Sequence, residues 1–288
     1  MKSKTIKSAL LSFIPLLLFS ACGKNDYLDI DASERPALSA KVKFVNARLS
    51  AAPVQFWDFT RRVTTTALAR NTATADYLDT QYGKVQYNLT EGTGTTYKAS
   101  YVFGGSANFV QETNTASFSG PNGPIATYYH TLFAVRKLRA STLNPGNTDS
   151  LVLVYDDLTA PAAGKAKVRF ANFANSARLV DLTYADGTGV FAGVAYGNFG
   201  NQTLIPYTSG KSPETIAGLS WKTLGPFKEL TAGANQSLLV KNTVSGTVLP
   251  VSGLAALDLE AGKIYTIFIT STTEAADSPL QATVIPQN

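Results

Sequence analysis

The only histidine in the chain is His130, so a Ser-His-Asp catalytic site would have to use it. It lies in the apolar segment 129–135, where we expect a half-buried strand residue rather than a catalyst. No Gly-x-Ser-x-Gly sequence supplies a nucleophile elbow. One histidine is also too few for a histidine-rich metal site. These residues favour a protein that is not an enzyme and holds no metal.

Asp156 and Asp157 are the most prominent pair of carboxylates, and two carboxylates are what many glycosidases use. Neighbouring residues on a strand point to opposite faces of the sheet, so this pair is not expected to converge. We expect solvated charges at a strand end. A hydrolase built from carboxylates scattered over the chain is the weakest of the functional readings.

Gly210-Lys211-Ser212 resembles the end of a phosphate-binding loop. That motif needs a glycine five residues before Gly210, where this chain has Ile205. Gly187-Thr188-Gly189 likewise lacks the continuation of a dinucleotide-binding motif. We therefore expect no nucleotide and no other cofactor.

Aromatic side chains are the feature with potential for binding. Trp57 and Trp221 are the only tryptophans, and tyrosines are concentrated between residues 77 and 129. Exposed rings can stack on sugars or anchor a protein partner. The alternative is that these rings form core and cross-strand pairs. Trp57 and Trp221 are the candidate ligand contacts.

The elements that would position these residues are β-strands. Segments 41–44, 55–57 and 84–89 alternate polar and apolar residues, which predicts one face on a core and one in water. Segment 151–155 is continuously apolar, as in a strand covered on both faces. The best candidate for a short helical turn is 65–70. The pattern predicts an all-β chain.

An internal repeat divides this β-rich region. Ala-Lys-Val-Lys-Phe-Val-Asn at 40–46 recurs as Ala-Lys-Val-Arg-Phe-Ala-Asn at 166–172. The matches that follow in the same order are Ser50-Ala51 with Ser176-Ala177, Val54 with Val180, Tyr82-Gly83 with Tyr196-Gly197, and 129–133 with 264–268. Such order indicates a duplication. We predict two tandem antiparallel β-sandwich modules, immunoglobulin-like or transthyretin-like, at 39–160 and 161–288. The short linker around Pro161 predicts modules that sit close, end to end.

The N-terminus has the layout of a secretory signal. Lys2, Lys4 and Lys7 precede an apolar stretch at 9–19 that is too short to span a bilayer. Residues 18–22 resemble the lipobox of bacterial lipoproteins. We therefore expect a signal peptide at 1–21 and lipidation of Cys22, the only cysteine. An acidic, flexible tether is expected at 22–38.

Removal of the signal changes the charge of the chain. The precursor has 25 basic and 20 acidic residues, and the three lysines that leave reduce the basic count to 22. A nearly neutral mature chain gives no indication of nucleic acid binding. Gly23 after the cysteine, followed by acidic residues, resembles an export tag for outer-membrane lipoproteins. We expect a protein in the outer membrane, anchored through the lipid on Cys22 and facing the cell exterior.

The repeated openings at 40–44 and 166–170, each followed by an Asn, are similar to the domain-of-unknown-function 4397 family. The Tyr-Gly dipeptides and the closing segment 261–268 share this similarity. The resemblance covers nearly all of 39–288. It implies an extracytoplasmic β-sandwich, frequently on lipoproteins, and it implies no particular activity.

The leading functional expectation is a surface-exposed pair of binding or adhesion modules, because duplicated modules can gain avidity. A glycan or an envelope protein is the expected partner. The alternative is a structural spacer or an accessory subunit of an outer-membrane assembly.

Overall fold

The structure is a computed structural model that describes residues 37–103, 123–136, 146, 148–177, 179–200, 225–275 and 277–288. The chain divides into two compact units, Met1–Ala37 and Leu38–Asn288, and every described strand belongs to the second. All regular structure within the described ranges is β-strand, which confirms the predicted all-β fold class. The predicted signal peptide 1–21, Cys22 and most of the tether lie outside the described residues.

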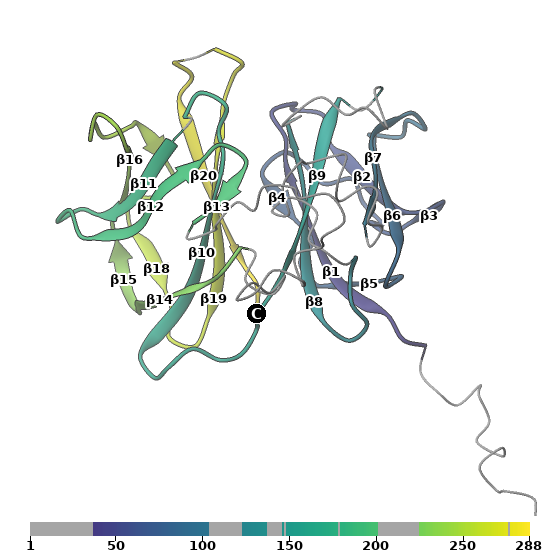
Figure 1. Cartoon of the computed structure of the whole chain (residues 1–288), viewed down its shortest axis with the longest axis horizontal. Helices are drawn as coiled ribbons and strands as arrows, with labels where there is room; N and C mark the ends of the chain where they lie inside the picture. The colour runs from purple at the N-terminus through teal and green to yellow at the C-terminus, as the bar shows by residue number, and fades with distance from the viewer. Residues whose placement is uncertain are drawn as a thin grey trace, which may run out of the picture. The chain divides into compact units, whose positions relative to one another are not determined.

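The first module contains two sheets (Figure 1). Its inner sheet has the strand order β4-β1-β8-β9, with β5 also paired to β1, and its outer sheet has the order β3-β2-β6-β7. The strands are β1 (Ala40–Ala47), β2 (Val54–Asp58), β3 (Arg61–Arg62), β4 (Thr72–Ala73), β5 (Leu78–Thr80), β6 (Val85–Glu91), β7 (Tyr97–Phe103), β8 (Tyr129–Arg136) and β9 (Asp149–Tyr155).

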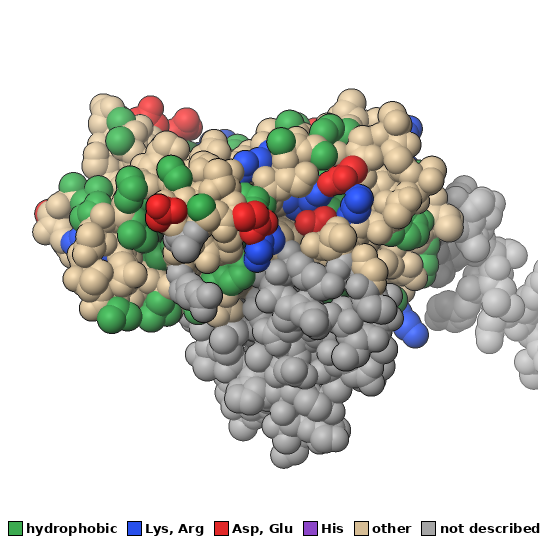
Figure 2. All heavy atoms as spheres, turned by 90° about the horizontal axis from the view of Figure 1, so that it is seen from above, with side chains coloured by type: hydrophobic (Ala, Val, Ile, Leu, Met, Phe, Trp, Pro, Cys, Tyr) green, Lys and Arg blue, Asp and Glu red, His purple; other side chains and the backbone are tan. Residues whose placement is uncertain are grey.

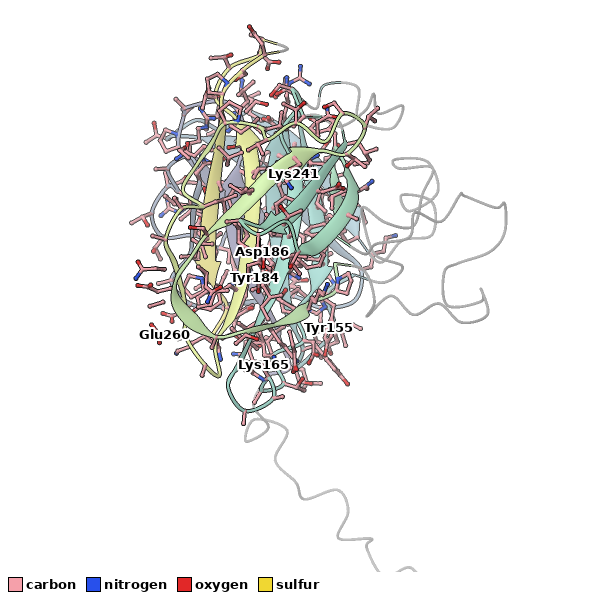
Figure 3. All side chains as sticks on the ribbon, turned by 90° about the vertical axis from the view of Figure 1, so that its left-hand side faces the viewer. Tyr155, Lys165, Tyr184, Asp186, Lys241 and Glu260 are labelled. Atoms are coloured by element: carbon pink, nitrogen blue, oxygen red, sulfur yellow. The ribbon has the colours of Figure 1, made fainter. Side chains whose placement is uncertain are left out.

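The second module repeats this plan. Its inner sheet has the order β13-β10-β19-β20-β17 with β14 beside β10, its outer sheet has the order β12-β11-β16, and β15 pairs with β18. The strands are β10 (Lys165–Phe173), β11 (Leu179–Tyr184), β12 (Gly189–Ala195), β13 (Asn198–Phe199), β14 (Lys228–Thr231), β15 (Gly233–Gln236), β16 (Leu238–Asn242), β17 (Val251–Ser252), β18 (Leu257–Leu259), β19 (Ile264–Ser271) and β20 (Leu280–Pro286). In Figure 3 the outer layer faces the viewer, with Tyr184 of β11 and Lys241 of β16 on it.

The two modules have equivalent strand pairings. β1 runs parallel to β8 with Lys41 opposite Tyr129, and β10 runs parallel to β19 with Lys167 opposite Ile264. Each inner sheet is thus mixed, whereas the sequence favoured purely antiparallel sheets. Alternation of side chains has the same period in both kinds of pairing, so it could not reveal the parallel pair.

The structure corrects one of the repeat matches. The backbone N–H of Gly197 donates to the carbonyl of Asn172, and the N–H of Asn71 donates to the carbonyl of Asn46, each at 2.7 Å. Gly197 and Asn71 both have positive φ values, of 82° and 57°. The counterpart of Tyr196-Gly197 is therefore Arg70-Asn71 and not Tyr82-Gly83. Asparagine is among the few non-glycine residues that tolerate the left-handed region, which hid the match from sequence comparison.

Segment 65–70, the candidate helical turn, forms no helix. Leu68 instead pairs with Val54 in an isolated antiparallel bridge, with both backbone hydrogen bonds made at 2.7 and 2.9 Å. The apolar side chain of Leu68 joins the core of the first module, so tertiary packing overrides the weak local preference.

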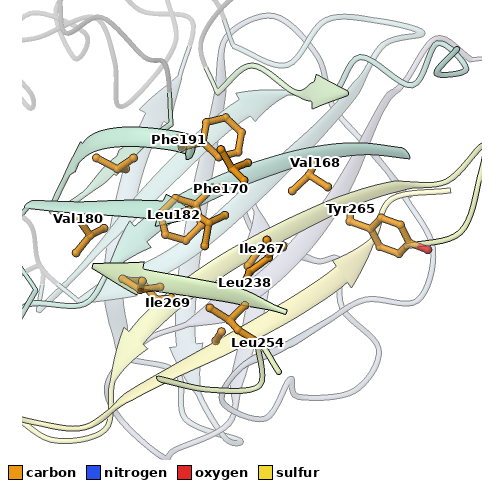
Figure 4. Packing of buried hydrophobic residues seen from close by; sticks show 14 of the residues in the cluster. Val168, Phe170, Val180, Leu182, Phe191, Leu238, Leu254, Tyr265, Ile267 and Ile269 are labelled. Atoms are coloured by element: carbon orange, nitrogen blue, oxygen red, sulfur yellow. The ribbon is translucent and has the colours of Figure 1, made fainter. Parts of the chain in front are cut away.

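Each module has its own core between its two sheets. The core of the first module includes Phe44 and Phe56, whose ring centroids lie 4.9 Å apart. Figure 4 shows the second core, where Phe170 of the inner sheet faces Leu182 and Phe191 of the outer sheet. The even-numbered residues of β1 and β10 supply these cores, as the predicted alternation requires.

A third core joins the two inner sheets to each other. It combines residues of both modules, which are Val45, Ala47, Phe133, Val135, Val152 and Val154 from the first and Ala171, Phe173, Phe199, Phe268 and Ile285 from the second. The modules therefore pack face to face, and the expected end-to-end arrangement is wrong. The second face of the alternating strand β1 is likewise buried in this interface instead of in water.

Candidate binding cleft between the two modules

Trp57 lies on β2, on the face of the outer sheet opposite to that of the core residue Phe56. It is half-buried, and its indole Nε1 donates to Thr90 Oγ1 at 3.0 Å. This cross-strand hydrogen bond fixes the ring on the sheet. Trp221 and the Gly210–Ser212 segment lie outside the described residues.

His130 is a core residue of β8, with only 2% of its surface exposed. Its ring packs edge-on against Tyr155 with centroids 6.0 Å apart. Burial lowers the pKa of His130 to about 4, against the opposing effect of Asp156 and a backbone hydrogen bond with Tyr128. The imidazole is therefore neutral at pH 7 and lies among structural partners.

Asp156 is not the solvated residue that the sequence suggested. Both it and Arg169 have no exposed side-chain surface, and Asp156 Oδ1 lies 2.7 Å from Arg169 Nη2. Thr131 Oγ1 and the Tyr77 hydroxyl donate to Asp156 Oδ2 at 2.6 and 2.8 Å. The carboxylate thus accepts hydrogen bonds at Oδ2, while Oδ1 faces the guanidinium in the ion pair. Asp157 is half-exposed and pairs with Lys167 at 2.9 Å.

The polar contacts around this ion pair are related by the repeat. Arg169 Nη1 donates to the carbonyl of Tyr155 at 3.2 Å, across the module interface. Its counterpart Lys43 donates from Nζ to the carbonyl of Pro286 at 3.0 Å, in the opposite direction. Tyr155 and Pro286 occupy equivalent positions on β9 and β20. The interface therefore has the reciprocal contacts of an isologous dimer.

Two other carboxylates, Glu91 and Asp149, converge on Arg48. Asp149 Oδ2 lies 3.1 Å from Arg48 Nε, and Glu91 hydrogen-bonds to Arg48 Nη2. Arg48 lowers the pKa of Glu91, whereas burial raises the pKa of Asp149. Both acids are held by the guanidinium between them, which is the arrangement of a structural ion pair.

A cleft lies where the ends of several strands meet. It has a volume of about 660 Å³, within the usual range of small-molecule sites. Its lining comes from β8 of the first module and from β12, β16 and three connections of the second: Arg136, Asn175, Ser176, Ala195, Tyr196, Asn242 and Glu274. Both modules thus contribute to it.

The repeated Asn of the sequence motif positions one wall. Asn172 is fully buried, and its Nδ2 donates to the carbonyls of Ala177 at 2.6 Å and Val194 at 3.1 Å. Its Oδ1 accepts from the N–H of Ala174 at 3.1 Å. Because these bonds tie the β10–β11 turn to the end of β12, Asn175 and Tyr196 are held on the same side of the fold.

Arg136 and Glu274 form the charged part of the cleft. Their contacts are bidentate, with Nε to Oε1 at 3.0 Å and Nη2 to Oε2 at 2.6 Å. Glu274 raises the pKa of Arg136, and burial raises the pKa of the Tyr196 hydroxyl, which lies beside that guanidinium. The lining contains one positive and one negative group, so it carries no net charge.

Two amides remain available in the cleft. Asn242 Oδ1 accepts from the N–H groups of Val244 and Ser245 at 2.9 and 3.0 Å, which leaves its Nδ2 without a partner among the described residues. The side chain of Asn175 makes no hydrogen bond within the described part of the chain. Ser176 is less available, because its Oγ bonds to Ser271 Oγ at 2.7 Å.

Sequence reasoning did not predict this cleft. Part of its signal was present in the motifs, since Ser176 and the positioning residue Asn172 belong to repeated segments. Arg136 and Glu274 both lie outside the repeated segments, so no sequence pattern indicated them. A cleft built from two modules depends on their packing, which no local pattern encodes.

Other features of the described residues are brief to state. No group of three or more His, Cys, Asp and Glu side chains is placed to hold a metal ion in these ranges. The described part of the chain also contains no helix long and apolar enough to cross a membrane. On the face shown in Figure 2, acidic and basic side chains of the described residues lie next to one another.

Comparison with known proteins adds little. The chain matches no protein-family model, and no curated protein matches it. Among solved structures, it is similar to a candidate cell adhesion protein from Bacteroides uniformis, at 10% identity over 88% of this chain and 100% of that one, with a TM-score of 0.20. A TM-score this low does not establish a shared fold. The resemblance to the domain-of-unknown-function 4397 family stays a prediction.

Proposed function

We propose that the protein is a non-catalytic lipoprotein of the cell envelope, displayed on the outer membrane, that binds a partner outside the cell. The observation that supports this proposal most directly is the polar cleft of about 660 Å³ that the two modules form together. A spacer needs no such cleft, and a simple tandem repeat would carry one site on each module.

The packing of the modules also supports a binding role. The third core and the buried Arg169–Asp156 pair hold the inner sheets against each other. A cleft whose walls come from two rigidly packed bodies is preorganised, and preorganisation lowers the entropic cost of binding. The interface between the modules therefore serves to keep the walls of the cleft in place.

The test uses the mature chain without its lipid, from Gly23 to Asn288. Purified protein is passed over immobilised envelope fractions, extracellular matrix proteins and polysaccharides, and binding is measured at millimolar sensitivity. We expect saturable binding to at least one of these components. Absence of binding to all of them contradicts the proposal. Stable co-purification with one envelope complex, unaffected by soluble competitors, would support the accessory-subunit alternative instead.

A further inference from the structure

We propose that the cleft formed by Arg136, Asn175, Tyr196, Asn242 and Glu274 is a single binding site for an uncharged glycan. This inference rests on the proposed binding function and specifies its ligand and its location. Three observations support it. They are the residues that line the cleft, the balance of charge between Arg136 and Glu274, and the side chains that fill the equivalent position on the other side of the module interface.

The polar side chains of the lining favour a ligand with hydroxyl groups over a purely apolar one. Its largest aliphatic side chain is Ala195, and the other members are polar, charged or aromatic. An apolar ligand would bury the amides of Asn175 and Asn242 without hydrogen bonds, and each such loss is costly. A ligand rich in hydroxyl groups can donate and accept at the same atom, so it can satisfy amides, a guanidinium and a carboxylate together.

The charge balance favours a neutral ligand. Arg136 and Glu274 already neutralise each other through two hydrogen bonds. An anionic ligand would have to compete with Glu274 for Arg136, and a cationic one would have to compete with Arg136 for Glu274. Sugar hydroxyls can bond to the remaining lone pairs and protons of this pair without separating it.

Tyr196 supplies the aromatic element. It is half-buried in the lining, and its hydroxyl lies at the Arg136 guanidinium. The hydroxyl oxygen is buried there, so the ring is the part of Tyr196 that a ligand can contact, and an aromatic ring suits the apolar C–H face of a pyranose. The tight turn at Gly197, with φ of 82°, fixes the ring at the end of β12.

The repeat explains why there is one site. The position equivalent to Tyr196 in the first module is Arg70, which reaches across the interface. Its Nη2 donates to the carbonyl of Ser271 at 2.6 Å and its Nη1 to that of Thr272 at 3.4 Å. Asn71 adds a hydrogen bond from Nδ2 to Gln281 Oε1 at 2.9 Å. These contacts occupy the second position, so one ligand should bind per chain.

The experiment screens the chain from Gly23 to Asn288 on an array of neutral and anionic glycans and then titrates the best ligand by calorimetry. We expect a neutral glycan at one site per chain. Asn175→Ala removes an amide that has no structural partner, and Tyr196→Ala removes the ring; each should weaken binding by about tenfold. Asn242→Asp keeps the acceptor that caps its turn and removes the donor, so it should weaken binding similarly.

Tyr82→Ala is the matched control, because Tyr82 is an exposed tyrosine of the first module outside the cleft. It should bind as the wild type does, and circular dichroism of all four variants should be unchanged. Equal binding by all variants would overturn the site, and preference for an anionic glycan would overturn the ligand class. Binding to an envelope protein with no glycan bound would overturn this inference and leave the proposed function standing. Binding to nothing would overturn both.

Discussion

Arg169 and Asp156 form an ion pair at 2.7 Å in which neither side chain has any exposed surface, although the two residues belong to different modules. Burying two charges costs more than a surface pair ever does, and only a complete set of hydrogen bonds offsets that cost. Here hydrogen bonds from Thr131 and Tyr77 to Asp156 Oδ2, and from the guanidinium to Thr266, contribute to that offset. The guanidinium also lies 4.5 Å from the ring centroid of Phe227.

The first prediction concerns this pair. Asp156→Ala leaves the buried Arg169 guanidinium without its counter-charge, and losses of this kind cost about 3–5 kcal/mol. We expect the free energy of unfolding of the chain from Gly23 to fall by about that amount in urea titrations. Lys41→Met, at the exposed Lys41–Asp79 pair, is the control and should cost no more than about 1 kcal/mol. Similar effects of both variants would mean that the pair is not buried between the modules.

The second prediction concerns pH. The pKa of His130 is about 4 in the folded chain and 6.5 in the unfolded one, so the unfolded chain binds the extra proton between these values. Stability due to this residue is complete above pH 6.5 and decreases as the pH falls toward 4. A difference of this size corresponds to roughly 3 kcal/mol. Urea midpoints measured from pH 7.5 to 4 should show the decrease.

His130→Leu supplies the comparison, because leucine cannot titrate and suits a core position beside Leu132. The part of the acid destabilisation that belongs to His130 should disappear in this variant. An identical pH profile in the variant and the wild type would show that other groups cause the decrease.

The third prediction concerns the repeated asparagines. Asn172→Ala removes a buried side chain that satisfies two carbonyls and one N–H, so it should destabilise the fold by roughly 2 kcal/mol or more. Asn46→Ala removes the equivalent side chain, which bonds to the carbonyl of Leu68 and the N–H of Arg48. Both should lower the melting temperature, whereas only Asn172→Ala should also weaken ligand binding. Loss of binding in both variants would argue against the position of the cleft.

The fourth prediction concerns the anchor. Cys22→Ser removes the only thiol in the chain, so the precursor should no longer incorporate a labelled fatty acid. The variant should leave the membrane fraction and appear in soluble extracts, while its fold remains unchanged. Retention of the variant in the membrane fraction after a high-salt wash would contradict lipidation as the anchor.

The sequence predicted the parts of the fold that depend on local pattern. The alternation in 41–44 and the continuous apolar run in 151–155 correspond to β1 and β9, and the second is covered on both faces as expected. The repeat offset at 40–46 and 166–172 corresponds to equivalent strands with equivalent partners. These features follow from the alternation of side chains along a strand and from internal duplication, and both can be recognised in a single sequence.

The buried ion pair and the cleft, which the sequence did not predict, depend on the packing of one module against the other. A basic residue in an alternating strand normally faces water, so nothing marked Arg169 as buried until its partner Asp156 was placed. The same holds for the cleft, since Arg136 and Glu274 are separated in sequence by more than the length of a module. The packing of one repeat against another produces no periodic pattern in the amino-acid sequence.

The parallel pairing of β1 with β8 affects how the protein would resist a mechanical pulling force. β1 begins two residues after Leu38, where the chain enters the fold, and it lies between β8 on one side and β4 and β5 on the other. Tension transmitted through an N-terminal anchor would pull along the axis of this central strand. Its hydrogen bonds to β8 would then be loaded together in shear, rather than opened one after another as at a peeled edge. Resistance to such a load is set by the rate of forced unfolding, so a tethered binding protein with this architecture could stay folded while the surface it holds is drawn away.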